Sequence, residues 1–340
     1  MTQILCITLI PFFYVGNLIY RAQVHPDYHE SASKWLQRLS LGLIGFCALF
    51  GLSLLFLASL DPQTQDQPGG WEAVNMAWLA LPMQRALPAF VLVMICSAAA
   101  AATLWSQNFR ELMAQTAFAD GDFRPHRSTH IVPLVLAFVL LAFILGTLAF
   151  RPQDLTVAEI SMEEILLQAF IFLACALLGV GYPLRRNEGR LFARLGLRVP
   201  VATDWWLGLA GGLVLLILVA LGGLIWQAVV SPAVFQEQTA ASREFVALFR
   251  NIPLMVLISL SSAVSEEIMF RGALQPIFGL WSTSLFFTFF HIQYGLNPAL
   301  LLIFLVGLGL GILRRRWSTS AAIIAHFTYN FLQLFGSLGG

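Results

Sequence analysis

Two adjacent glutamates, Glu266 and Glu267, stand in an otherwise apolar stretch, and Arg271 follows four residues after the second. A single ionisable residue at the centre of a membrane helix costs about 2.5–3.5 kcal/mol on insertion scales, so two carboxylates there need a partner or water. Because residues four apart share a face of a helix, Glu267 can pair with Arg271. Glu266 points about 100° away, and it is then free to act as a general base.

Two further polar side chains occur downstream at the same four-residue spacing. His326 precedes Asn330 in AHFTYNF, and His291 follows Phe287 in FFTFFHIQYG. The asparagine amide could orient the imidazole or donate a hydrogen bond to a developing oxyanion. A carboxylate base, two imidazoles and an amide donor are sufficient to activate water against a peptide carbonyl and to stabilise the oxyanion.

Each of these patterns also has a structural reading. A Glu–Arg pair in a membrane can be a clasp or part of a proton relay, and a His–Asn pair is often a hydrogen bond between helices. Together they favour a hydrolase over a proton-coupled transporter, which would show internal repeats and paired broken helices. The other alternative is a non-catalytic membrane immunity or partner-binding protein, in which Glu266 could be replaced without loss of function.

The composition is that of a membrane protein. Of the 340 residues, 58% are hydrophobic and 11% are charged, and the mean hydropathy is +0.78, values that a soluble domain does not reach. Apolar runs long enough to cross a bilayer predict an all-α, polytopic helical bundle of about ten (8–10) transmembrane helices. These runs lie near residues 2–20, 39–60, 86–105, 131–150, 165–184, 206–230, 252–270, 278–292, 298–313 and 318–336.

The charges between the runs support this topology. Cytoplasmic loops collect Lys and Arg, and most of the 19 basic residues fall in alternate loops, one of which would contain Arg271. The pattern predicts a multi-pass protein of the cell membrane with both termini outside. The net charge of +1, without a basic patch interleaved with aromatic residues, predicts no nucleic-acid partner.

A change in composition near residue 185 predicts a domain boundary. The stretch 185–200, RRNEGRLFARLGLRVP, places apolar side chains among arginines, which is typical of a short helix on the inner face of the membrane. Residues 1–184 would form an N-terminal transmembrane region of unknown role. Residues 185–340 would form a second part that holds every candidate for intramembrane chemistry.

The motifs EExxxR, FxxxH and HxxxN, in this order, resemble those of the CAAX protease and bacteriocin-processing family of intramembrane proteases. This family is also called the Abi or type II CAAX prenyl endopeptidase family. EEIMFRGALQPIF looks like its first motif and SAAIIAHFTYN looks like its last, and the resemblance covers roughly residues 190–335. It implies an endopeptidase with its site inside the membrane, acting on a membrane-embedded or lipid-anchored protein or peptide.

The resemblance also implies a role for each polar residue of the motifs. These roles are water activation by Glu266, positioning of water or substrate by His291 and His326, oxyanion binding by Asn330, and support by Glu267 and Arg271.

A metal is a further possibility, because Glu266, His291 and His326 could together bind zinc. The two histidines do not share a helix as they do in HExxH, and a glutamate base needs no ion. We therefore expect no obligatory cofactor.

The predicted helices create one spatial conflict. Simple alternation of spans places His291 near the outer face of the membrane and Glu266 near the inner face. A common site then requires either that the segment 272–292 is partly re-entrant, with Pro276 bending its start, or that the helix boundaries are off by a turn or more.

Overall fold

The computed structural model describes residues 26–59, 83–147, 162–183, 186–247, 249, 251–291 and 297–337. All regular secondary structure within these ranges is helical, as the sequence predicts. Among the described residues, six segments are long and apolar enough to cross a membrane: Gln37–Phe56, Met83–Trp105, Ser128–Gly146, Met162–Val180, Ala202–Val229 and Ile252–Phe289. The chain is therefore a polytopic membrane protein, but the predicted count of about ten spans is not confirmed. The first predicted span, residues 2–20, lies outside the described residues.

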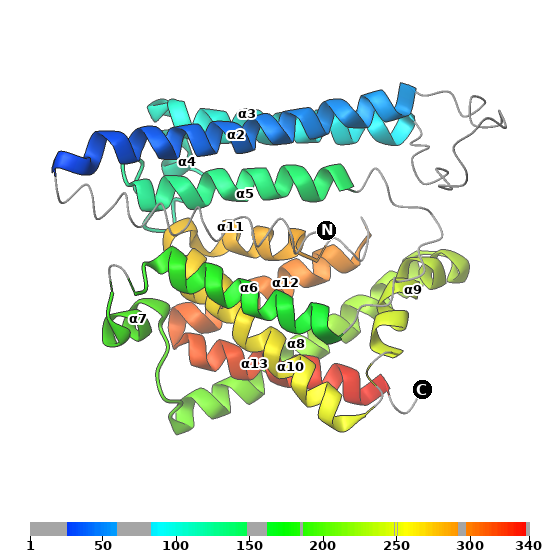
Figure 1. Cartoon of the computed structure of the whole chain (residues 1–340). Helices are drawn as coiled ribbons and strands as arrows, with labels where there is room; N and C mark the ends of the chain where they lie inside the picture. Colours follow the sequence, from blue (N-terminus) through cyan, green and yellow to red (C-terminus); the bar gives the residue numbers. More distant parts are fainter. Residues whose placement is uncertain are drawn as a thin grey trace.

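Three long helices of the N-terminal region form one layer. These are α2 (Pro26–Ser59), α3 (Met83–Trp105) and α5 (Ser128–Thr147), which Figure 1 shows lying side by side, with the short α4 (Gln107–Gln115) between α3 and α5 in the chain. Small buried residues of α3, such as Ala86, belong to the apolar core that the three long helices share. Small side chains allow helices in a membrane to approach closely.

The C-terminal helices pack beneath this layer (Figure 1). They are α6 (Met162–Val180), α7 (Glu188–Leu195), α8 (Ala202–Val229), α9 (Pro232–Ala247), α10 (Ile252–Glu266), the π-helix η4 (Glu267–Leu274), α11 (Gln275–Phe289), α12 (Ala299–Arg316) and α13 (Thr319–Gly336). Helix α13 packs against α8, α10 and α12, and α6 packs against α10 and η4. Helix α5 contacts α11, so it joins the layer to the C-terminal helices.

Helix α7 lies in the stretch that the sequence predicts to contain an amphipathic helix. Its Leu191 and Leu195 are buried against η4, whereas Phe192 is exposed. The short helix is thus present. The predicted boundary at residue 184 stays a prediction, and α6, on the N-terminal side of it, shares its packing with α10 and η4.

The end of the π-helix η4 lies just before Pro276. Pro276 has no backbone N–H, so a carbonyl one turn earlier loses its usual helical partner. The carbonyl oxygens of Arg271 and Gly272 instead accept hydrogen bonds from the side chains of Arg314 (3.2 Å) and Arg194 (2.8 Å). Side chains from two other helices therefore satisfy the backbone where the helix widens.

The chain reverses direction at Gly279, within the residue range of α11. Gly279 has φ 79° and ψ 177°, a conformation that is essentially restricted to glycine. Phe270 stacks edge-on against Phe287 at 5.2 Å between ring centroids, and Glu266 lies opposite His291. Both pairs are symmetric about the bond between residues 278 and 279, so η4 and α11 form a helical hairpin.

This hairpin resolves the spatial conflict in the predicted topology and corrects two predictions. The span predicted to end at Phe270 continues to residue 278, and Arg271 is a fully buried helical residue, not a loop residue. Glu266 and His291 lie equal numbers of residues before and after the reversal, and their side chains face each other. Both residues therefore return to the same depth, and the bend is at Gly279 and not at Pro276.

Candidate active site

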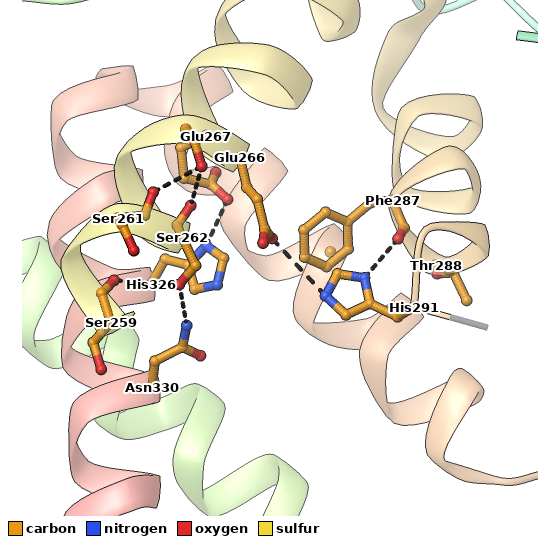
Figure 2. A network of polar contacts seen from close by, with 12 residues as sticks. Ser259, Ser261, Ser262, Glu266, Glu267, Phe287, Thr288, His291, His326 and Asn330 are labelled. Carbon is orange, nitrogen blue, oxygen red and sulfur yellow. Dashed lines mark hydrogen bonds and ion pairs between the residues drawn. The ribbon is translucent and has the colours of Figure 1, made fainter. Parts of the chain in front are cut away.

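Glu266, the last residue of α10, points toward His291, which follows the end of α11 (Figure 2). Glu266 Oε2 lies 3.9 Å from His291 Nε2, too far for a direct hydrogen bond. Oε2 is buried and accepts no hydrogen bond from any described residue. A buried carboxylate oxygen without a hydrogen-bond partner among the described residues requires an explanation, and one water molecule between the two side chains would satisfy it.

The ring orientation of His291 is fixed by its own helix. Its Nδ1 lies 2.8 Å from the carbonyl oxygen of Phe287. A carbonyl oxygen only accepts hydrogen bonds, so Nδ1 must carry the proton, and in a neutral ring Nε2 is then an acceptor. The Phe287 ring packs on the imidazole at 4.6 Å between centroids. Glu266 Oε2 thus faces Nε2, the ring nitrogen that is not engaged by the Phe287 carbonyl.

Glu267 points to a different side of the helix from Glu266 and connects two partners. Its Oε2 lies 3.3 Å from Nε of Arg271, and its Oε1 lies 2.9 Å from Nδ1 of His326 on α13. The pairing of Glu267 with Arg271, predicted from their spacing, is thus present. Arg271 also donates a hydrogen bond to the carbonyl oxygen of Gly307 (3.2 Å) and lies 4.7 Å from the Phe287 ring centroid.

Burial separates the two glutamates. The side chains of Glu267 and Arg271 are 0% exposed, whereas those of Glu266 and His291 are 10% and 21% exposed. Of these four side chains, only Glu266 and His291 therefore keep surface that another molecule could reach.

Asn330, one turn after His326 on α13, donates a hydrogen bond from Nδ2 to Ser262 Oγ at 3.0 Å (Figure 2). The spacing left open whether the Asn330 amide orients the His326 imidazole or donates to an oxyanion. Because Glu267, and not Asn330, contacts the imidazole, the first of these alternatives is not what the structure shows. The amide carries a second N–H, which remains available to an oxyanion beside His326.

Ser262 is a site residue that the sequence analysis missed. It precedes Glu266 by one turn of α10, in the same SLSSAVSEE segment. The i, i+4 spacing of Ser262 and Glu266 could have placed both on one face. Two further serines nearby, Ser259 and Ser265, are also buried.

The metal possibility can be compared with this geometry. In the part of the chain that the structure describes, no three His, Cys, Asp or Glu side chains are grouped as metal ligands. The contact of His326 Nδ1 with Glu267 leaves Nε2 as the ring nitrogen that could bind a metal. Among the described residues, however, Glu266, His291 and His326 are not drawn together into the three-ligand site that zinc would need.

Comparisons with known proteins support the resemblance seen in the motifs. Residues 248–332 match the family described as type II CAAX prenyl endopeptidase, Rce1-like, a segment that runs from before α10 to α13. The resemblance to intramembrane CAAX proteases is thereby confirmed for this segment, which contains all six candidate residues.

A curated protein gives a second, shorter match. The uncharacterized protein YpbD of Bacillus subtilis (strain 168) is 44% identical over 45 residues, which is 13% of this chain and 24% of that protein. The match thus covers about a quarter of the relative's length. No solved structure matches this chain significantly.

Proposed function

We propose that this protein is an intramembrane endopeptidase of the CAAX type. It would hydrolyse a peptide bond in a membrane-embedded or lipid-anchored protein or peptide. The observation that carries this proposal is the 3.9 Å separation between Glu266 Oε2 and His291 Nε2, in a segment that matches a CAAX endopeptidase family. The spacing suits one water molecule held between two acceptors.

The first step is attack by this water. One O–H points to the Glu266 carboxylate and the other to Nε2 of neutral His291, so the oxygen lone pairs face a third direction, where a substrate carbonyl can sit. The water oxygen forms a bond to the carbonyl carbon while a water proton passes to Glu266. Holding both reactants in this geometry removes much of the entropic part of the barrier.

The second step is stabilisation of the oxyanion and release of the amine. Asn330 donates its second amide N–H, and protonated His326 donates from Nε2 while Glu267 holds Nδ1. Such preorganised donors are usually the largest single contribution to acyl-transfer catalysis. Glu266 then returns its proton to the leaving nitrogen, the C–N bond breaks, and a carboxylic acid and an amine are formed; the acid loses its remaining water-derived proton to the amine or to solvent and becomes a carboxylate.

No step in this scheme passes through a metal ion. The negative charge that a metal would stabilise is assigned to the donors of His326 and Asn330, and the base is a carboxylate. Treatment with a chelator therefore provides a direct test of the scheme.

The two alternatives from the sequence differ in what they require of Glu266. An immunity or partner-binding protein needs the fold but not the carboxylate. A proton-coupled transporter would use Glu266 as a proton carrier, which gives no reason for an asparagine and a histidine to converge beside it. The convergence of Glu266, His291, His326 and Asn330 favours hydrolysis (Figure 2).

The test compares peptide termini in membranes that contain the wild-type protein, Glu266→Gln or the matched control Glu163→Gln at equal levels. Glu163 is an exposed residue in the first turn of α6. New termini that appear with the wild type and Glu163→Gln, but not with Glu266→Gln, would support the proposal and identify the substrate. Identical profiles for all three would reject it.

A further inference from the structure

The loop that joins α4 to α5 contacts the helical hairpin at its point of reversal. Four contacts connect residues 117–122 with residues 276–282, although the two segments are about 160 residues apart. They are Asp122 N–H to the Pro276 carbonyl (3.0 Å), Leu280 N–H to Asp120 Oδ2 (2.8 Å), Ser282 Oγ–H to the Ala117 carbonyl, and Phe118 against Phe278 (5.1 Å between ring centroids).

The contact made by Asp120 is a helix cap supplied from another part of the chain. Because Gly279 breaks the helix, the N–H groups after it have no partner in the preceding turn. The Asp120 carboxylate accepts from Leu280 N–H and places a negative charge at the start of the returning helix, where its dipole is positive. Arg315 Nη1 lies 3.6 Å from the same oxygen.

The backbones at this contact are too close for side chains larger than hydrogen. A Cβ on Gly279 would lie 1.9 Å from Asp120 Oδ1, and a Cβ on Gly121 would lie 2.3 Å from the Ile277 carbonyl oxygen. Two glycines on opposite segments thus allow the loop to reach the reversal. Both glycines are needed for this close approach of the two backbones, because a side chain at either position would clash with the opposite segment.

This contact bears on the candidate active site through the symmetry of the hairpin. Glu266 and His291 lie at equal distances from the reversal, so the angle and register set at residues 279–280 decide whether they face each other. We propose that Asp120 is a positioning residue for the site: by capping the returning helix at Leu280, it holds His291 opposite Glu266. This proposal rests on the proposed function for its catalytic consequence.

The first readout is peptidase turnover by purified full-length variants. The substrate is the peptide that the comparison of termini identifies as cleaved by the wild type. Asp120→Ala removes the cap, and kcat is expected to fall about 10- to 100-fold with KM within about twofold, as a misplacement of roughly 1 Å can cause. Asp120→Asn keeps an oxygen acceptor and should stay within about threefold of the wild type, because Asn and Asp cap helices about equally well.

Asp122→Ala is the matched control. It removes a carboxylate from the same loop, but that carboxylate pairs with the exposed Arg124, and the contact of Asp122 with the hairpin is made by its backbone. If Asp120→Ala does not yield a monodisperse protein, Asp120→Ser replaces it, since the shorter hydroxyl cannot reach Leu280.

The second readout is independent of catalysis. With ¹⁵N-labelled histidine, the six histidines give a small set of imidazole signals, and His291→Gln assigns the one of interest. This signal should move in Asp120→Ala and stay in place in Asp122→Ala and Asp120→Asn.

An unmoved His291 signal in Asp120→Ala would overturn the proposal, whether or not the wild type cleaves peptides. A moved signal with kcat at the Asp122→Ala level would also overturn it, while leaving the proposed function intact. If the wild type shows no cleavage, the proposed function fails, and the His291 signal alone then decides whether Asp120 positions this side chain.

Discussion

The buried ion pair of Glu267 and Arg271 offers the sharpest test of the energetics. Both side chains are 0% exposed and lie 3.3 Å apart. Removing one partner, as in Arg271→Met or Glu267→Gln, leaves the other buried with its charge incompletely compensated, which costs about 3–5 kcal/mol. At roughly 2–4 °C per kcal/mol for a large domain, each single variant should lower the apparent thermal midpoint by roughly 6–20 °C.

The double variant Glu267→Gln/Arg271→Met separates charge burial from lost packing. With both charges of the pair gone, neither Glu267 nor Arg271 leaves the other uncompensated, so the midpoint should recover above that of either single variant. Peptidase turnover should not recover, because a neutral glutamine does not stabilise protonated His326. The double variant would thus regain stability relative to the single variants without regaining turnover.

The assay is thermal unfolding of each purified variant in the same detergent, followed by tryptophan fluorescence. Asp122→Asn is the control, because the ion pair of Asp122 with Arg124 joins side chains that are 65% and 59% exposed and should contribute less than about 1 kcal/mol. A double variant whose loss equals the sum of the two single losses would refute the reasoning, since the two charges would then act independently.

Two further predictions concern the chemistry. Ser262→Ala removes the acceptor that holds Asn330, and kcat should fall about 2- to 10-fold, the equivalent of one hydrogen bond, with an unchanged thermal midpoint. The control is Ser261→Ala, because the Ser261 hydroxyl donates within its own helix. An equal fall in kcat for both variants would contradict the assigned contact. Turnover should be unchanged after treatment with 1,10-phenanthroline and EDTA, and a loss that added zinc restores would show that the reaction needs a metal.

Short-range features of the site could be predicted from the sequence. The four-residue spacing of Glu267 and Arg271 was enough to pair them, because an α-helix and a single wide turn both leave these positions on one side. The helical class followed from long apolar runs, since only helices satisfy the backbone of a chain that crosses lipid in single segments. Glu266 could be separated from Glu267 because neighbours on a helix point in different directions.

Features that depend on distant parts of the chain could not be predicted. The sequence pattern places Arg271 in a loop because the apolar run ends at Phe270 and basic residues collect in cytoplasmic loops, and it does not show that the carbonyl oxygen of Gly307, on another helix, accepts a hydrogen bond from this arginine. Gly279 is one of 26 glycines, and its role depends on a cap from Asp120. The partner of Asn330 is on another helix, so spacing alone suggested His326 instead.

The measurement that tests the central claim most directly is the rate at which purified protein in lipid nanodiscs cleaves a substrate peptide of the wild type. Glu266→Gln and Glu163→Gln are compared at equal amounts of folded protein. Loss of the general base should lower kcat by about 10²–10⁴-fold, whereas Glu163→Gln should match the wild type. If Glu266→Gln retains wild-type turnover, Glu266 does not activate the water, and the account of this site is wrong.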